Sequence, residues 1–380
     1  MRAQPDPQRA TRRIRLGMVG GGDGSFIGAA HRIAARIDDE LVAGALSSSP
    51  ERAHASAVKL HINPERSYAS YEAMAQAEAQ RSDGIDAVVV VTPNHLHVPV
   101  ARAFAERGIH VICDKPLATS LADAQALAQV VQAHGLLFLL THTYAGYPMV
   151  RQARELVQAG ELGELRIVQV EYAQDWLGEP VEQQGNKQAE WRADPQRAGP
   201  AGALGDIGTH AYQLARFVSG LQVQELSADL STFVPGRTLD DHVQAMLRFE
   251  GGARGMLWAS QVASGACNAL RLRVYGTRGS LHFDQEQPEQ LWFAPQGQPA
   301  RLLRRGMAPH SVSLASESRI PAGHPEGYFE AFATLYRDFA RAWRGGESGL
   351  MPGLRDGLDG MRFIEAVLDS HRQNARWVTL

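Results

Sequence analysis

The sequence predicts an α/β protein in two parts, in which a parallel sheet covered by helices precedes an α/β domain with a large, mainly antiparallel open sheet. In the first third of the chain, short apolar strands alternate with helical stretches, as in doubly wound parallel sheets. The first of these strands runs directly into a cluster of glycines. After about Tyr144, strand-like segments follow one another through short turns, which favours antiparallel pairing.

Short apolar segments are the expected strands of the parallel sheet: Ile14–Val19, Leu41–Leu46, Ile85–Val91, His110–Cys113 and Leu136–Leu140. The helices expected between them are Ala29–Ile37, Pro50–Leu60, Tyr71–Arg81, Val98–Arg107 and Leu121–His134. The run Val88–Val91 is apolar on both faces, which is typical of a strand that helices cover on each side.

The strands expected in the second part are Leu165–Tyr172, Gln224–Thr232, His242–Phe249, Ala253–Ser260, Leu270–Tyr275 and Ser280–Phe283. Glycine-containing turns at 250–252 and 276–279 predict hairpins. The expected helices are Gly205–Val218, Tyr328–Trp343 and Leu354–Gln373. Residues 285–324 are rich in Pro, Gly, Gln and Ser, and predict a long surface excursion.

The composition excludes several classes of partner. A length of 380 residues predicts two domains, and a net charge of -3 argues against nucleic acid or an anionic membrane as the main partner. No apolar run approaches the roughly 18 residues that cross a bilayer. Cys113 and Cys267 lie far apart and have no metal-binding spacing, which predicts free thiols in a reducing, cytoplasmic compartment and no metal site.

A glycine-rich turn follows the first strand and opens into a helix, with the sequence Gly-Gly-Gly-Asp-Gly-Ser-Phe-Ile-Gly over residues 20–28. Glycines let a pyrophosphate approach the backbone, and the N–H groups at a helix N-terminus attract its charge. The spacing is looser than the standard fingerprint, by what corresponds to a two-residue insertion. The pattern predicts a Rossmann domain that binds NAD or NADP. Its candidate contacts here are Gly20, Gly22, Ser25, Phe26 and Ile27.

We therefore expect a disordered tail over residues 1–13, an NAD(P)-binding Rossmann domain over 14–142, and a substrate-binding and oligomerisation domain over 143–380. The second strand does not end in the acidic residue that usually binds an unphosphorylated ribose. It ends in serines, with Ser47 and Ser48 as candidate ribose contacts and Arg52 one turn into the next helix. Hydroxyl groups beside an arginine can also bind a 2′-phosphate, so the choice between NAD and NADP stays open.

Polar residues follow two neighbouring strands at the carboxyl edge, where such sheets bind ligands. Thr92, Asn94 and His95 follow one strand, and Asp114-Lys115-Pro116 follows the next. In the second part, the segment Gly-Asp-Ile-Gly-Thr-His over residues 205–210 opens a helix, and its Asp206 and His210 share one helical face. Oxidation of a secondary alcohol needs a hydride acceptor, a base and a group that stabilises the developing alkoxide. Histidine suits the role of base and lysine that of the cation.

Read together, these motifs resemble those of the Gfo/Idh/MocA oxidoreductase family, over essentially the whole chain from Arg15 onward. The family usually has Glu-Lys-Pro where this sequence has Asp114, a departure that leaves Lys115 in place. The resemblance implies that Lys115 contacts the reacting hydroxyl and the cofactor ribose. It also implies that His210 is the acid/base, that Asp206 binds substrate or orients groups around it, and that Asn94 and His95 lie near the nicotinamide.

The segment Gln174-Asp175-Trp176, together with Trp191-Arg192, is similar to the branch that includes levoglucosan and inositol dehydrogenases. Aromatic faces suit the apolar C–H faces of sugar and cyclitol rings. The candidate substrate contacts, besides Lys115, Asp206 and His210, are Tyr144, Asp175, Trp176, Trp191 and Arg192. The resemblance implies an NAD(P)-dependent dehydrogenase acting on a ring CH–OH group of a polyol, with NAD favoured. It also implies a homodimer or homotetramer, which an open sheet face would help to form.

Other interpretations stay open at this point. Asp206 could be only an N-cap, because an aspartate at a helix start accepts backbone N–H bonds. Within the same family, the enzyme could be a reductase of a keto sugar or an imine, since hydride transfer is reversible. A non-enzymatic regulator that senses dinucleotides is a third possibility, against which the presence of Lys115, Asp206 and His210 weighs.

Overall fold

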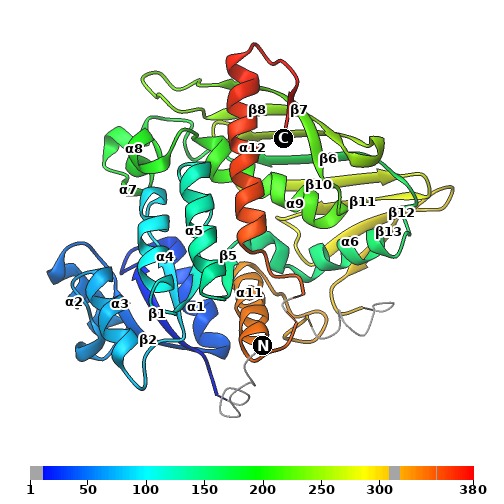
Figure 1. The fold of residues 1–380 in the computed structure, drawn as a ribbon. Helices are drawn as coiled ribbons and strands as arrows, with labels where there is room; N and C mark the ends of the chain where they lie inside the picture. The colour runs from blue at the N-terminus through cyan, green and yellow to red at the C-terminus, as the bar shows by residue number, and fades with distance from the viewer. Residues whose placement is uncertain (1–11, 308–316, 348) are drawn as a thin grey trace. The chain divides into compact units, whose positions relative to one another are not determined.

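The computed structural model describes residues 12–307, 317–347 and 349–380 (Figure 1). The chain divides into two compact units. The first contains the described residues up to Thr143 together with Tyr328–Leu358, and the second contains Tyr144–Gly327 and Asp359–Leu380. Each unit has a sheet of its own, and each is described by itself.

The first unit is built on a five-stranded parallel sheet in the order β2-β1-β3-β4-β5. Its strands are β1 (Arg15–Gly20), β2 (Glu40–Ala45), β3 (Ala87–Val91), β4 (His110–Cys113) and β5 (Phe138–Leu140). Its helices include α1 (Phe26–Asp38), α2 (Pro50–Lys59), α3 (Tyr71–Gln80), α4 (His97–Ala105) and α5 (Leu121–Ala133). The predicted Rossmann sheet is confirmed. The strand order reverses between β1 and β3, the position where such sheets bind their ligands.

A helix from much later in the chain completes this unit. Helix α11 (Tyr328–Trp343) packs on α1, and Phe332, Tyr336 and Phe339 belong to the buried cluster that also contains residues of β1 and β3. The division made from the sequence assigned all of 143–380 to the second domain. The structure differs because the apolar face of α11 is buried against the first sheet's helical layer.

The second unit contains a nine-stranded sheet in the order β13-β12-β11-β10-β6-β9-β8-β7-β14. Its strands are β6 (Leu165–Ala173), β7 (Val223–Ser231), β8 (His242–Phe249), β9 (Arg254–Ser260), β10 (Ala269–Gly276), β11 (Gly279–Asp284), β12 (Gln290–Pro295), β13 (Arg301–Arg304) and β14 (Val378–Thr379). The β6–β9 pair is parallel, and the other neighbouring strands of this sheet pair antiparallel. The predicted mainly antiparallel sheet is confirmed.

The surface excursion predicted over 285–324 is wrong over β12 and β13, whereas residues 317–324 form turns and bends. Strands β12 and β13 extend the sheet there, and Leu291 and Phe293 are buried on either side of the exposed Trp292. The alternation that buries them is only a few residues long, and the surrounding Gln, Pro and Gly obscure it. Residues 308–316 of the predicted excursion lie outside the described residues.

Helices cover one face of this sheet, chiefly α6 (Pro148–Gln158) and α9 (Thr209–Ser219). The other helical elements of the unit include α7 (Lys187–Arg192), α8 (Pro195–Ala198) and the π-helical turn η6 (Leu204–Gly208). The long α12 (Leu354–Arg372) begins in the first unit and ends in the second. Short 3-10 turns occur at Pro64–Arg66, Asn94–Leu96, Thr143–Gly146, Val181–Gln184 and Glu250–Gly252.

Most of the predicted N-terminal tail, residues 1–11, lies outside the described residues. Arg12, at its end, is held by Asp86: both of its terminal nitrogens donate to the carboxylate at 2.7 Å. Among the described helices, none combines the length and apolar character that crossing a membrane requires.

Candidate active site

The glycine turn after β1 is packed so closely that side chains would not fit. A Cβ atom on Gly20 would lie 2.3 Å from the carbonyl oxygen of Val91, and one on Gly22 would lie 2.6 Å from that of Leu46. Gly20 also has a φ of +76°, a conformation that favours glycine. The turn therefore exposes bare backbone at the strand-order reversal, as a dinucleotide cradle requires.

The helix that follows the turn is fixed to it from several sides. Ser25 is the N-cap of α1, and its hydroxyl accepts from the N–H of Gly28 at 3.1 Å. Arg32, which is buried, donates to the carbonyl oxygen of Gly21. Of the other predicted contacts, Phe26 is largely exposed and stacks on Tyr328.

Ile27 packs against the buried core of the first unit. Gly28 was absent from the predicted site, although a Cβ there would lie 2.3 Å from the carbonyl oxygen of Gly21. Its position at the end of the glycine motif was the available signal. The helix can approach the turn only because Gly28 has no side chain.

The residues after β2 are suited to a ribose but do not decide its phosphorylation. Ser47 is half-buried, and its hydroxyl accepts from the N–H of Ser49 at 3.2 Å. Ser48 and Arg52 are exposed. Ser49 caps α2. Ser47, Ser48 and Arg52 are therefore accessible to a ribose, as the sequence-based hypothesis requires.

Buried polar side chains follow the carboxyl end of β3. The hydroxyl of Thr92 and Nδ1 of His95 are buried and have no hydrogen-bond partner among the described residues. Asn94 is also buried. Buried polar groups are normally hydrogen-bonded, so the Thr92 and His95 atoms and the glycine cradle fit a polar ligand such as a dinucleotide.

Lys115 stands between two anchored neighbours. On one side, the Asp114 carboxylate accepts from Nε2 of His31 at 2.9 Å and from the Thr141 hydroxyl at 2.6 Å. On the other side, Nδ1 of His97 lies 2.7 Å from the carbonyl oxygen of Pro116.

His97 also reaches the carbonyl oxygen of Thr92, at 3.0 Å, so it joins the loops after β3 and β4. Burial lowers the pKa of His97, although the nearby Asp114 carboxylate opposes this shift. His97 therefore supports the Lys115 loop, a role that sequence reasoning did not assign to it.

In the second unit, Asp206 lies in the π-helical turn η6, directly before α9. The prediction of one regular helix over Gly205–Val218 therefore misses this turn, and π-helical turns are frequent at functional sites. Asp206 is not an N-cap. Its Oδ2 accepts from Nε of Arg192 at 3.0 Å and from Nε2 of Gln261 at 2.9 Å.

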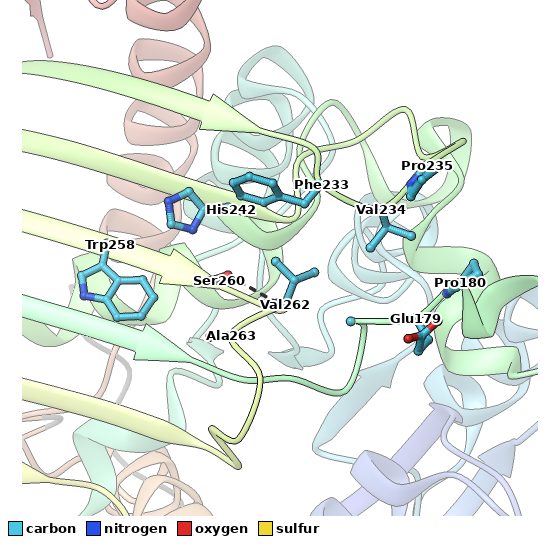
Figure 2. A pocket seen from close by; sticks show the side chains of 11 residues that line it. Glu179, Pro180, Phe233, Val234, Pro235, His242, Trp258, Ser260, Val262 and Ala263 are labelled. Carbon is cyan, nitrogen blue, oxygen red and sulfur yellow. Dashed lines mark hydrogen bonds between the residues drawn. The ribbon is translucent and has the colours of Figure 1, made fainter.

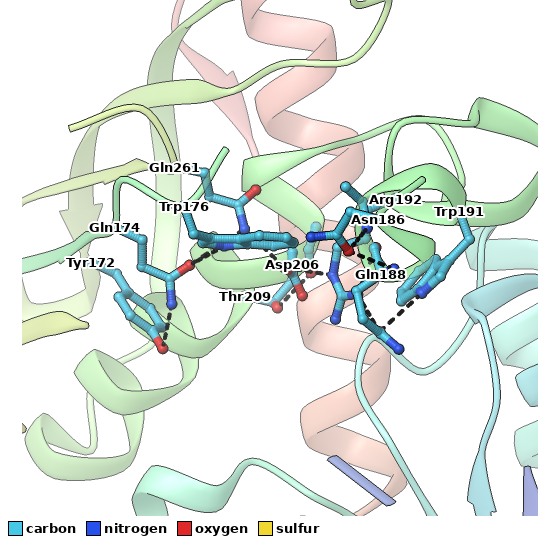
Figure 3. Close-up of polar contacts among 12 residues, drawn as sticks. Tyr172, Gln174, Trp176, Asn186, Gln188, Trp191, Arg192, Asp206, Thr209 and Gln261 are labelled. Atoms are coloured by element: carbon cyan, nitrogen blue, oxygen red, sulfur yellow. Dashed lines mark hydrogen bonds and ion pairs between the residues drawn. The ribbon is translucent and has the colours of Figure 1, made fainter. Parts of the chain in front are cut away.

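Arg192 is held between Asp206 and aromatic rings (Figure 3). Its guanidinium carbon lies 4.2 Å from the ring centre of Trp191 and 5.8 Å from that of Trp176. A third group, the carbonyl oxygen of Gln188, accepts from Nη1 at 3.0 Å. The predicted residues Trp176, Trp191, Arg192 and Asp206 therefore do come together.

A chain of polar contacts continues from Trp176, whose Nε1 donates to Oε1 of Gln174 at 3.0 Å. Nε2 of Gln174 donates to Oδ1 of Asn268 at 2.7 Å, and the hydroxyl of Tyr172 donates to the same oxygen at 2.7 Å. Tyr172 and Tyr144 share a short hydrogen bond.

This chain of contacts ends beside His210, whose ring centre lies 4.9 Å from that of Tyr144. Burial raises the pKa of Tyr144, and the Asp206 carboxylate adds to the rise. Tyr144 is thus near both predicted catalytic groups of this unit, Asp206 and His210.

Asp175 is the predicted substrate contact that the network does not include. It is exposed, and its carboxylate accepts from the N–H of Gly265 at 3.0 Å, which ties down the loop after β9. Conversely, the network includes Gln261, Tyr172 and Asn268, which were not predicted. It also includes Gln174, which belongs to the resembling segment but was not a predicted contact. Gln174 precedes Asp175, and Gln261 follows a strand end, but glutamine alone is a weak signal.

A separate pocket of ≈ 640 Å³ opens at the rim of the second sheet, and Phe233, His242 and Trp258 are among its lining residues (Figure 2). Ser260 and Val262 also line it, whereas Gln261 between them donates to Asp206. None of the predicted site residues lines this pocket. In the described part of the chain, no group of His, Cys, Asp and Glu could hold a metal ion.

Comparisons with known proteins identify the family of the chain. The family "Oxidoreductase family, NAD-binding Rossmann fold" matches residues 14–142, and "GFO/IDH/MocA C-terminal domain" matches residues 150–282. Levoglucosan dehydrogenase of Pseudarthrobacter phenanthrenivorans is 31% identical over 323 residues, which are 77% of this chain and 80% of that protein. The first unit therefore contains an NAD-binding Rossmann domain.

Two crystal structures of an inositol dehydrogenase homolog from Azotobacter vinelandii are also similar. The complex with NAD+ is 39% identical, with a TM-score of 0.94 over 98% of each chain. The complex with NADH and myo-inositol is 38% identical, with a TM-score of 0.91 over 98% of this chain and 99% of that one.

Proposed function

Because this chain belongs to the GFO/IDH/MocA family of NAD-binding oxidoreductases, we propose that it is a dehydrogenase of a ring polyol. It transfers a hydride between a secondary alcohol of a sugar or cyclitol and a nicotinamide cofactor. The observation that carries the proposal is the network around Asp206. That network joins a carboxylate, two amides, an arginine and two indole rings near His210. Such a mixture suits a ring with apolar C–H faces and a polar rim.

The first unit would hold the cofactor through its glycine cradle and the polar atoms after β3. Gly20 and Gly22 would admit the pyrophosphate to the backbone, and Thr92 and His95 would meet polar groups of the nicotinamide half. We favour NAD, with Ser47 contacting the ribose. Titration of NADH and NADPH by tryptophan fluorescence tests this assignment. Ser47→Asp should lower the NADPH affinity relative to that for NADH, and an unchanged ratio would contradict the placement.

A bound nicotinamide supplies the hydride acceptor. In the proposed oxidation, the His210 imidazole takes the proton of the reacting hydroxyl. The Lys115 ammonium stabilises the negative charge that develops on the same oxygen. Asp206, whose Oδ2 is held by Arg192 and Gln261, accepts a hydrogen bond from a neighbouring hydroxyl. The ring lies against Trp176 or Trp191.

The experiment is an absorbance assay at 340 nm over a panel of sugars, inositols, anhydrosugars and simple acyclic alcohols. Oxidation of ring polyols should rise with pH as the imidazole loses its proton, and His210→Asn should remove that limb and lower the rate. His134→Asn, on an exposed histidine of the first unit, is the control. Acyclic alcohols that react as well as any ring polyol would contradict the substrate class. Cofactor binding without turnover would favour the dinucleotide-sensing alternative.

A homo-oligomer, either a dimer or a tetramer, is the proposed assembly. The sheet face opposite α6 and α9 carries exposed apolar side chains. Met246 pairs with Met256 across β8 and β9, and these side chains are 53% and 50% exposed. Ile167 and Trp292 are also exposed, and the polar Gln169, Arg273 and His282 lie between Met256 and Trp292 in the register of the sheet. Apolar patches of this kind mark interaction surfaces. Light scattering should give a larger mass for the wild type than for Met246→Glu with Met256→Glu; equal masses would count against this interface.

A cytoplasmic location is proposed from the cysteines. The structure contains no disulfide between Cys113, which is buried, and Cys267, which is exposed. Free thiols of this kind are usual in a reducing compartment.

A further inference from the structure

Asp240 precedes β8 and accepts hydrogen bonds from the backbone just before Asp206. Its Oδ1 accepts from the N–H of Gly202 at 2.6 Å, and its Oδ2 accepts from the N–H of Leu204 at 2.7 Å. Its carbonyl oxygen accepts from the N–H of Ala203 at 2.9 Å. A single residue thus holds three consecutive N–H groups at the start of the π-helical turn.

The turn needs an external acceptor of this kind. The first N–H groups of a helix have no partner within the helix, and a capping side chain usually satisfies one of them. Here the residue in the cap position is Ala203, which offers no side-chain acceptor. Asp240 replaces the local cap, and its negative charge also interacts favourably with the positive end of the helix dipole.

The approach of the two segments depends on a glycine. A Cβ atom on Gly202 would lie 2.1 Å from the carbonyl oxygen of Asp240, too close for any side chain without movement of the backbone. Asp206 is joined to the same turn, because its N–H donates to the carbonyl oxygen of Gly202 at 2.9 Å. A shift at Gly202 would therefore move Asp206.

The residue after Asp240 supports the side chain of Asp206 through an intermediary. The carbonyl oxygen of Asp241 accepts from the backbone N–H of Gln261 at 2.9 Å, and Nε2 of Gln261 donates to Asp206 at 2.9 Å. The backbone and the carboxylate of Asp206 are thus both supported from the segment that enters β8.

We propose that Asp240 is a positioning residue that fixes the turn carrying Asp206 and His210 and thereby sets the geometry of the substrate site. The inference rests on the proposed dehydrogenase function and adds a residue that does not itself touch the substrate. Burial raises the pKa of Asp240 to about 6, while its hydrogen bonds with Leu204 and Gly202 oppose the rise. Its carboxylate is therefore ionised at pH 8, where its N–H contacts are charge-assisted.

The test compares Asp240→Ala and Asp240→Asn with Asp229→Asn, which changes an exposed aspartate of β7. Hydrogen exchange at pH 8 should be faster for the amides of Gly202 and Leu204 in Asp240→Ala than in the wild type or the control. Its kcat/KM on the best ring polyol should fall by about 100-fold, because displacement of a site by about 1 Å has effects of that size. Asparagine retains one acceptor oxygen, so kcat/KM should fall less in Asp240→Asn than in Asp240→Ala. NADH affinity, a property of the first unit, should not change.

Unchanged exchange at these amides, or unchanged kcat/KM despite faster exchange, would overturn the proposal. If Asp240→Ala does not fold, Asp240→Asn and Gly202→Ala test the same contact, and Gly202→Ala should also speed exchange and lower kcat/KM. A wild-type enzyme that binds NADH but turns over no polyol would instead refute the proposed function. A wild type that is active alongside equally active Asp240 variants would refute only the role of Asp240.

Discussion

The imidazole of His31 joins two parts of the first unit, because its Nε2 lies 2.9 Å from the Asp114 carboxylate and its Nδ1 lies 2.8 Å from the Tyr336 hydroxyl. Burial opposes ionisation of Asp114, but the interactions with His31 and Thr141 keep its pKa below the ordinary value. The carboxylate is thus charged at neutral pH and held directly before Lys115. Asp114, which stands where the family usually has Glu, is therefore held in place by hydrogen bonds from His31 and Thr141.

Replacement of this acceptor should weaken both the fold and the site. Asp114→Ala leaves Nε2 of the buried His31 without its acceptor, while the Thr141 hydroxyl keeps only its 3.3 Å contact with the carbonyl oxygen of Cys113. A buried unsatisfied group typically costs about 1–3 kcal/mol of unfolding free energy. The loss of activity should exceed what the smaller folded fraction explains, because the loop that carries Lys115 loses the hydrogen bonds of Asp114. Urea unfolding and steady-state kinetics measure the two effects. Asp369→Ala, at an exposed aspartate of α12, should change neither by much; wild-type kinetics in Asp114→Ala would show that the anchor is dispensable.

Gly22→Ala should prevent dinucleotide binding. The added methyl group would meet the carbonyl oxygen of Leu46 at 2.6 Å, so the cradle must move. We expect at least a tenfold loss of NADH affinity in a fluorescence titration, equivalent to about 1.4 kcal/mol. Gly360→Ala is the matched control, because a Cβ there meets no atom within 4 Å. Equal affinities for the two variants would exclude this turn as the cofactor site.

Lys115→Met should act on turnover more than on cofactor affinity. The ammonium group is needed most when negative charge develops on the substrate oxygen, so the loss should appear mainly in kcat. One such interaction is typically worth a factor of about 100 or more. Lys187→Met removes a lysine from the exposed start of α7 and serves as control. Retention of more than about a tenth of the wild-type kcat would contradict an essential role for Lys115.

The stability of the protein should depend on pH through Asp39. Burial raises the pKa of Asp39 to about 6, although its hydrogen bond from the N–H of Ile14 opposes the rise. A carboxyl group in the unfolded chain has a pKa of about 3.9, so the folded state binds the proton more tightly. The charged form therefore costs stability, and this cost develops as the pH rises from about 4 to about 6.

Asp39→Asn removes the charge and keeps an oxygen that can accept from Ile14. Its melting temperature should exceed that of the wild type at pH 8, and the difference should shrink at pH 5. Thermal unfolding at both values, with Asp369→Asn as an exposed control, measures this. A difference independent of pH would mean that Asp39 does not titrate in this window.

Features set by local sequence were predictable, and those set by distant contacts were not. The β4 bounds, His110–Cys113, agree with the predicted strand, since a short apolar run carries its own signal. The glycine turn was also recognisable, because its glycines lie next to one another in the sequence. The cap of the π-helical turn was not, because Asp240 lies 38 residues from Gly202. Nor does the apolar stripe of α11 reveal which sheet it covers.

The network around Asp206 was predicted only in part. Trp176, Trp191 and Arg192 were recognised through their resemblance to a family branch. Gln261 and Asn268 belong to the loop that joins β9 to β10, and their amides gain their meaning from partners far away in the sequence. A glutamine or asparagine in a loop is ordinary unless its neighbours in space are known.

The position of α11 has a consequence for biosynthesis. A chain emerging from the ribosome presents β1–β5 long before Phe332, Tyr336 and Phe339 have been made, and these side chains belong to the buried cluster of the first unit. Domains generally fold as units during translation, N-terminal ones first. Here the core of the first unit stays incomplete until Tyr328–Leu358 have been translated, after most of the second unit. Nascent chains arrested before residue 328 should therefore be more sensitive to protease in the first unit than chains arrested after Trp343.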